Sequence, residues 1–173
     1  MANACVDAND FQLDGGGRLQ LDAHFLRSAT ANFTHTLAGL SGVYEEITEI
    51  APLVIPVSGV WVVTWDVHGN VNNTPAAIGT AVATNVFASL FRNDVIVIGT
   101  ETAVGINSQG APTTAQPSLQ LHMTGSGTDV LDLVANDELS LYAARASDAG
   151  TTTQVLSGPT GRTRIRAWRL GSS

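Results

Sequence analysis

The chain has 173 residues, of which 44% are hydrophobic and only 13% charged, and its formal net charge is −7. The length suits one domain with a short extension, and the charged fraction is well below the roughly 25% of an average soluble domain. The negative charge disfavours nucleic acid as a partner, and the sequence lacks the apolar run of about 18 residues that membrane insertion needs. A surface so poor in charge favours burial against other subunits.

Residues 1–45 are expected to form an arm. They lack the basic and apolar stretches of a secretory signal, and the single cysteine, Cys5, cannot form an intrachain disulfide. The stretch VDANDFQLDGGGRLQLDAHF predicts a small hairpin around residues 14–18. Because an isolated two-stranded hairpin is marginal in water, the arm is expected to dock on neighbouring subunits. The residues expected to anchor it are Phe11, Leu13, Leu19, Leu21 and Phe25.

Residues 46–173 show mainly the period-2 alternation of strands. In VWVVTWDV one face carries Trp61, Val63, Trp65 and Val67. The aromatics Trp61, Trp65, Phe87 and Phe91 are expected in the core, or packed along a trimer axis, rather than as platforms for sugars. SLQLHM and ELSLYAAR repeat the alternation, with inward residues at Leu119, Leu121 and Met123 and at Leu139, Leu141 and Ala143.

Two tight turns and a final strand complete the predicted domain. Asn93-Asp94 and Asn136-Asp137 interrupt alternating stretches, and both residue types accept the positive φ of a tight hairpin. TRIRAWRL predicts the last strand. The succession of short strands, without a long amphipathic helix, predicts an all-β antiparallel sandwich over residues 46–173.

Four polar segments are predicted as loops that could carry recognition, or could be plain connections: 68–85, 100–117, 124–128 and 145–161. The candidate binding or interface residues in the first of these are His68, Asn70, Asn72 and Asn73.

The last strand carries a row of arginines. Alternation is expected to place Arg162, Arg164 and Arg166 on one face, followed by Trp168. This row could bind a carboxylate-rich neighbour or an anionic glycan, because guanidinium groups pair bidentately with such groups. Alternatively, it meets the protein's own acidic residues across strands or subunits.

No motif predicts chemistry. The sequence has no Gly-x-Ser-x-Gly elbow, and its histidines lack the spacing of metal ligands, so we predict a non-enzyme with no catalytic residue, cofactor or metal site. A calcium ion held by loop aspartates is left open, as is a pair of acids for glycoside cleavage. The candidate calcium ligands are Asp129, Asp132, Asp137 and Asp148.

From Pro52 onward the chain resembles the C1q/TNF-like jelly roll. The resemblance is carried by VIPVSGVWVVTWDV, SLFRNDVIV, VLDLVANDELSLYAA, with Asn136-Asp137 where Gly-Asp is usual, and RTRIRAWRLG. It implies a jelly-roll β-sandwich that forms a homotrimer. The chain departs from the family in having Leu156-Ser157-Gly158 where Phe-Ser-Gly is usual.

The opening, ANACVDANDFQLDGGGRLQLD, resembles that of minor tail proteins of bacteriophages. Together these resemblances imply a virion protein, made in the host cytoplasm: a trimeric knob whose arm binds other virion proteins and whose loops bind a host-surface glycan or protein. The alternatives are a capsid decoration protein, a free lectin-like binding module and a polysaccharide depolymerase.

Overall fold

The computed structural model describes residues 11–13, 19–21, 25–28, 31–73, 79, 81–110, 113–114, 118–147 and 151–171. Every regular element within these residues is a β-strand. The strands are β1 (Phe11–Leu13), β2 (Leu19–Leu21), β3 (Phe25–Arg27), β4 (Phe33–Thr36), β5 (Glu45–Glu46), β6 (Leu53–Val54), β7 (Gly59–Asn73), β8 (Val82–Arg92), β9 (Val95–Ile96), β10 (Thr102–Gln109), β11 (Leu119–Leu133), β12 (Glu138–Ser147), β13 (Thr151–Ser157) and β14 (Arg164–Gly171).

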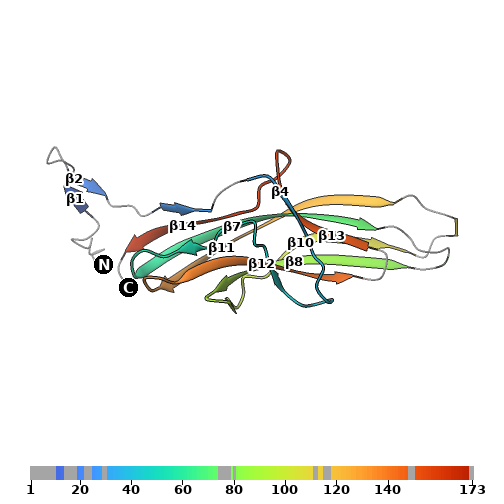
Figure 1. Cartoon of the computed structure of the whole chain (residues 1–173), viewed down its shortest axis with the longest axis horizontal. Coiled ribbons are helices and arrows are strands. Elements are labelled where there is room, and N and C mark those ends of the chain that lie inside the picture. Colours follow the sequence, from blue (N-terminus) through green and yellow to red (C-terminus); the bar gives the residue numbers. More distant parts are fainter. Residues whose placement is uncertain are drawn as a thin grey trace, which may run out of the picture.

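The strands form two antiparallel sheets that face each other as the layers of a sandwich (Figure 1). In the first sheet, β7 pairs with β11 along its whole length. On its other side β7 pairs first with β14 and then with β13, which in turn pair with β3 and β4. The second sheet runs β10-β8-β12, followed by β5 and β6 on the far side of β12. We call them the β7 sheet and the β8 sheet.

The strand order is that of a jelly roll. If β3 with β4, β5 with β6, and β13 with β14 each count as one strand, and the separate pair β1-β2 and the short β9 are set aside, the described part of the sandwich has eight strands. The β7 sheet then reads first, eighth, third and sixth, and the β8 sheet reads second, seventh, fourth and fifth. This nested order is the double Greek key of a jelly roll. The predicted all-β antiparallel jelly-roll sandwich is therefore confirmed.

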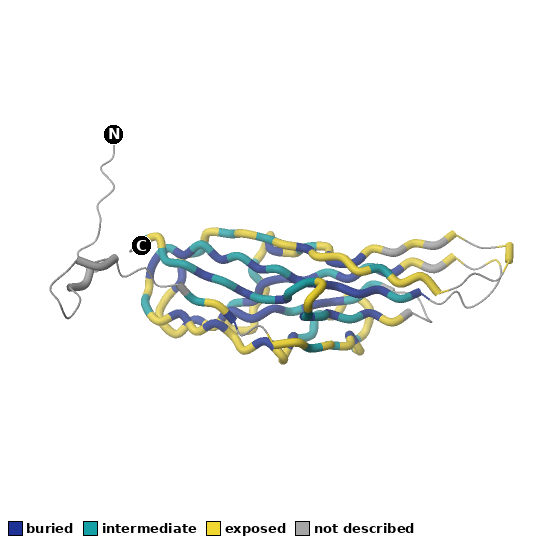
Figure 2. The backbone as a smooth tube through the Cα atoms, turned by 90° about the horizontal axis from the view of Figure 1, so that it is seen from above, coloured by how far each residue is buried: buried dark blue, intermediate teal, exposed yellow. Residues whose placement is uncertain are grey.

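The hydrophobic core lies between the two sheets, along the middle of the sandwich (Figure 2). On β7 the predicted face is buried, with Trp61, Val63 and Val67 at 0% exposure and Trp65 at 3%. On β12, Leu139, Leu141 and Ala143 face the same core. Phe91, by contrast, lies on the outer side of the β8 sheet, where its ring stacks on that of Tyr142 at 3.9 Å.

Glycines allow β10 to pass close to β7 and β11. A Cβ atom on Gly69 would lie 2.1 Å from the carbonyl oxygen of Val104, so no larger residue fits there without moving the backbone. A Cβ on Gly127 would lie 2.1 Å from the ring of Trp65, which therefore packs flat against β11. These contacts close one side of the sandwich.

Both predicted turns are confirmed. Asn93 and Asp94 have φ of 51° and 63°, and Asn136 has φ of 72°. The described residues of the predicted loops, however, lie largely in strands. β7 continues through Asn73, β11 runs through residues 124–128, and β10 and β13 occupy parts of the other two segments. Cross-strand pairing along the full length of β7 explains the difference, because it outweighs the low strand propensity of Asn, Ser and Gly.

Part of the predicted arm pairs with strands of the sandwich. β3 and β4 pair with β14 and β13, and Leu37 is 1% exposed in the core. Ser28 donates its backbone N–H to the carbonyl of Ile165, and its hydroxyl accepts from the N–H of the same residue, both at 2.9 Å. Among the described residues, the sandwich therefore begins at β3, while the docking of an N-terminal arm on a neighbouring subunit stays a prediction.

Candidate assembly surface

The candidate functional site is the outer face of the β7 sheet and the edge beside it. Asp66 stands at the centre of this face, with Arg164 opposite it on β14 and Ser126 opposite it on β11. Its carboxylate accepts hydrogen bonds from Arg164 Nε (2.7 Å), Arg166 Nη2 (3.0 Å) and Ser126 Oγ (2.7 Å). One carboxylate thus links three strands.

Two opposing effects set the pKa of Asp66. Burial alone would raise it, because a desolvated carboxylate loses its hydration. The hydrogen bonds from Arg164 and Ser126 and the charges of both arginines outweigh burial, so the pKa lies below its ordinary value. Asp66 is therefore ionised at neutral pH, and with two arginines the cluster carries one net positive charge.

Next to this polar cluster the same face becomes apolar. Trp168 on β14, Val62 on β7 and Val130 on β11 lie side by side in register across the three strands. Val130 is 56% exposed, and Leu170 and Val60 extend the patch toward the end of the sheet. The outer face of an antiparallel sheet is usually polar, so an apolar row here is a candidate contact surface.

Strand β11 is the edge of the β7 sheet. It is 15 residues long, and among the described residues no strand pairs with its outer side. Its charged residues are Asp129 and Asp132, while Leu119 and Met123 are 41% and 38% exposed. The predicted burial of these two residues is therefore wrong. Natural proteins protect such edges with lysine, proline or short strands, none of which this edge has.

Sequence reasoning missed the apolar row and Asp66. The signal was present in VWVV, where both faces of one strand carry valine or tryptophan. A strand with one core face and one solvent face would alternate with polar residues, so valines on the second face indicate that it too is buried against something.

The four candidate residues of β7 lie on a strand rather than a loop. His68 and Asn70 are 3% and 4% exposed, Asn73 is fully buried, and Asn72 is half-buried. Asn70 donates to Gln154 Oε1 (2.9 Å), and Asn73 Oδ1 accepts from Thr84 (2.9 Å). Their amides thus bind neighbouring strands, and a role for them as an external binding surface stays a prediction.

His68 stacks on His122 of β11, with ring centroids 5.5 Å apart, and its Nδ1 lies 3.0 Å from Thr124 Oγ1. Burial first, and then the charge of the neighbouring imidazole, lower the pKa of His68 below its ordinary value. The buried ring is therefore neutral at neutral pH. Two histidines do not make a metal centre, and no group of three potential metal ligands occurs among the described residues.

The arginine row is divided by the structure. Arg164 and Arg166 lie on β14 and share Asp66, as expected if the row meets the protein's own acids across strands. Arg162 precedes the strand and donates to Asn32 Oδ1 at 2.7 Å. Trp168 lies on the open apolar row. The three arginines therefore do not form one continuous row on β14, which begins only at Arg164.

The anchoring residues fall into two groups. Phe11 and Leu13 pair with Leu21 and Leu19 in a separate two-stranded sheet, while the turn at 14–18 lies outside the described residues. Phe25 instead pairs with Trp168 as part of β3.

Of the candidate calcium ligands, Asp148 lies outside the described residues, and Asp137 binds Arg92 at 2.6 Å. No helix in the described part of the chain is long and apolar enough to span a membrane.

No family model and no curated protein matches the sequence. Among solved structures, the chain is similar to Eiger TNF from S. frugiperda, at 13% identity and a TM-score of 0.40, over 86% of this chain and 94% of that one. It is also similar to murine APRIL at pH 8.0, at 10% identity and a TM-score of 0.39, over 86% and 99%. Murine APRIL at pH 5.0 gives 11% identity and a TM-score of 0.35, over 84% and 98%. Because sequence identity and structural similarity to these proteins are both low, the assignment of the fold rests on the strand order of this chain.

Proposed function

We propose that this chain is a non-enzymatic structural subunit of a bacteriophage particle, which forms a trimeric surface knob and is anchored by its N-terminal segment. One observation carries the self-assembly: the edge of β11, with which no other described strand pairs on its outer side, lies beside the partly exposed apolar row Trp168, Val62 and Val130. The virion role rests on the resemblance of the opening residues to minor tail proteins, and on the charge-poor composition.

The edge and the face suggest how the subunits meet. Packing the β11 edge of one subunit on the outer face of the next covers both the unpaired strand and the apolar row. Such a contact joins two different surfaces, and it closes into a ring if the rotation between subunits is right. Three subunits is the number that the C1q/TNF resemblance implies.

The N-terminal segment supports attachment to a particle. Its strands β1 and β2 pair with each other, and among the described residues they pair with no strand of the sandwich. A two-stranded sheet of this size is marginal alone, so it gains stability by docking on a neighbouring protein.

We favour a tail or fibre position over capsid decoration. Three copies of the same loops would give avidity for a host-surface ligand.

Light scattering tests the assembly. We expect three times the chain mass of 18.0 kDa for the wild type. Val130→Arg places a charge in the apolar row and should give monomers, whereas Val54→Arg should leave the trimer intact. Val54 is the matched control, because it is 51% exposed, against 56% for Val130, and lies on the β8 sheet. A monomeric wild type, or equal masses for the two variants, contradicts the assembly proposal.

The virion role needs a separate measurement. Mass spectrometry of purified phage particles should find the full chain in a copy number divisible by three. A variant that lacks residues 1–24 should still form trimers but should be absent from the particles. Particles without the chain, or incorporation that ignores the deletion, contradict the proposed anchoring.

A further inference from the structure

A short hairpin on the β8 sheet exposes three aliphatic side chains. We call residues 93–101, which include β9, the finger. Ile98 is 92% exposed, Val95 66% and Ile96 39%, while Val97 packs against the core. In Figure 1 the segment leaves the lower side of the sandwich, opposite β14. Exposed aliphatic residues gathered in one segment indicate a contact surface more often than an unused one.

The finger is held firmly at both ends. Its turn is fixed by Asn93, which donates its backbone N–H to the Glu138 carbonyl (2.9 Å) and accepts the Glu138 N–H on its side chain (2.9 Å). At the return, Thr100 Oγ1 donates to the Val97 carbonyl (2.7 Å) and accepts the N–H of Leu90 (3.1 Å). A preorganised surface loses little conformational entropy on binding.

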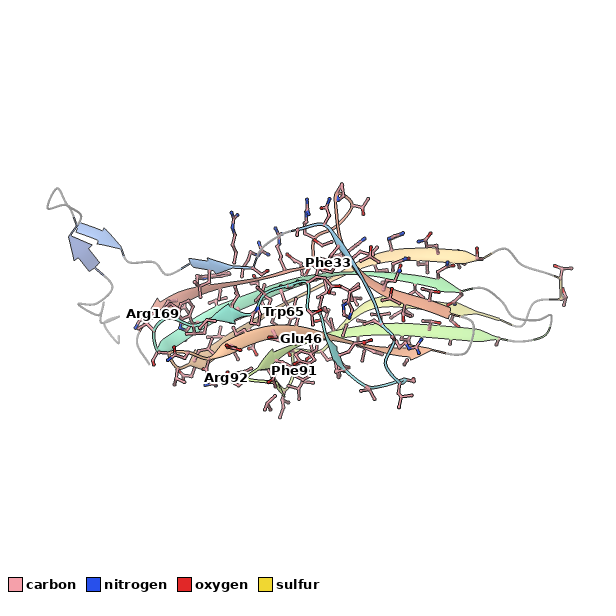
Figure 3. All side chains as sticks on the ribbon, in the orientation of Figure 1. Phe33, Glu46, Trp65, Phe91, Arg92 and Arg169 are labelled. Atoms are coloured by element: carbon pink, nitrogen blue, oxygen red, sulfur yellow. The ribbon has the colours of Figure 1, made fainter. Side chains whose placement is uncertain are left out.

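Carboxylates stand on both sides of these aliphatic residues. Tyr142 donates its hydroxyl to Asp94 (2.9 Å), and Tyr44 donates its hydroxyl to Glu101. Both tyrosine rings pack on the ring of Phe91, which is labelled in Figure 3. The ring centroids lie 3.9 Å apart for Tyr142 and 5.7 Å apart for Tyr44, so both phenols are fixed to the sheet. The adjacent guanidinium of Arg92 is paired with Asp137 at 2.6 Å. Among the described residues, neither carboxylate of the finger forms an ion pair with an arginine.

We propose that the finger is the docking surface for a different protein, whose contact surface is an apolar pocket rimmed by lysine or arginine. Such a partner would bury Ile98 and Val95 while its cations pair with Asp94 and Glu101. The same carboxylates repel nucleic acid and anionic membranes, so the partner is a basic protein surface. That the finger stays outside the trimer rests on the proposed function, because the assembly face lies on the opposite sheet.

Binding of defined peptides to the immobilised full-length chain tests the proposal. The probe is a peptide of alternating arginine and leucine, and its counterpart has glutamate in place of every arginine. The arginine peptide should bind, more weakly as salt is added, and the glutamate peptide should not. Ile98→Ser, and separately Asp94→Asn with Glu101→Gln, should each weaken binding by roughly tenfold or more. Leu40→Ser, at a site 79% exposed outside the finger, is the matched control and should bind like the wild type.

Three outcomes would overturn the proposal: no binding of the arginine peptide, equal binding of both peptides, or equal loss in Leu40→Ser and Ile98→Ser. The mass of every variant is measured in parallel. If Ile98→Ser breaks the trimer, the finger is a contact between copies, and docking of a different protein is refuted. If the wild type is monomeric, the assembly proposal fails, while peptide binding still decides the role of the finger.

Discussion

The outer faces of the two sheets differ in how far the chain itself covers them. The outer face of the β8 sheet is covered by the protein itself: Tyr44 packs on Phe91, and Thr100 bonds Ser89 at 2.8 Å. On the outer face of the β7 sheet, by contrast, the row Trp168, Val62 and Val130 is only partly covered within the described residues: Val130 is 56% exposed, and Trp168 and Val62 are half-buried.

The contrast shows where the chain supplies its own cover and where it relies on another molecule. A sheet with apolar residues on both faces must bury both, because each exposed valine forgoes about 1.5 to 3 kcal/mol of burial. The segments around Tyr44 and Thr100 do this for one sheet. For the other sheet, the cover is expected from a second copy, and the predictions below test that difference.

The largest effect is expected from truncation through β4. Removal of residues 1–37 deletes β3, β4, the Ser28 bonds and the buried Leu37, and should cost more than about 3 kcal/mol or prevent folding. Removal of residues 1–24 should leave the unfolding midpoint of the sandwich unchanged. Urea unfolding followed by tryptophan fluorescence measures both. A folded and equally stable 38–173 fragment would return β3 and β4 to the arm.

Substitutions of two tryptophans distinguish the core from the outer face of the β7 sheet. Trp61→Ala should lower the free energy of unfolding by about 3 to 5 kcal/mol, because Trp61 is completely buried between the sheets. Trp168→Ala should cost less in the subunit and instead shift the assembly toward monomers. Denaturant unfolding and light scattering of both variants measure the two effects. Equal losses of stability with unchanged mass would argue against a covered outer face.

Acid should weaken the link at Asp66. Because its pKa in the folded chain lies below the ordinary 3.8, the stability that it contributes is present above that pH and is lost as the pH falls through the lower, folded value. Asp66→Asn should cost about 1 to 2 kcal/mol at neutral pH and flatten this acid dependence. Part of the acid dependence should remain in this variant, because a second carboxylate, Asp137, also has a lowered pKa. Burial would raise the pKa of Asp137, but the hydrogen bonds that it accepts from Val134 and Arg92 outweigh burial.

Melting temperatures of the wild type and Asp66→Asn, measured from neutral pH to about pH 2, test this prediction. The two curves should converge as the pH falls. If they stay parallel, Asp66 is not held by the two arginines in solution.

The smallest effect is expected at Tyr142. Burial, and then the hydrogen bond to Asp94, raise the pKa of its hydroxyl to about 12. Its contribution to stability is therefore full below the ordinary 10.0 and is lost as the pH rises toward the raised value. Tyr142→Phe should cost about 1 kcal/mol at neutral pH. An alkaline titration of tyrosinate absorbance measures the shift, and an ordinary titration of both tyrosines would exclude it.

Local patterns were sufficient for the core and the turns. The alternation around Trp61 and Trp65 predicted the buried face of β7, and Asn93 and Asn136 predicted positive φ where the turns occur. The extension of β7 through Asn73 could not be predicted in this way, because Asn residues alone favour turns. Its cause is pairing with β11 and β13, which are distant in sequence.

The candidate site was predicted only in part. The arginines and Trp168 were recognised as a feature, but their meeting with Asp66 and Val62 depends on the register between β14 and β7. Register is fixed by the whole sandwich, since a shift of one residue would turn every side chain of β14 to the other face.

The sequence by itself thus determined the all-β class, the inward faces of β7 and β12 and the positions of two tight turns, because these depend on residues near one another in the chain. The tertiary structure decided that β3 and β4 belong to the sandwich, that no other described strand pairs with the outer side of β11, and that Val130 is exposed on one outer face while Phe91 is covered on the other. Each of these depends on which distant strands pair, and the free energy of that pairing is summed over the whole molecule rather than encoded in any one segment.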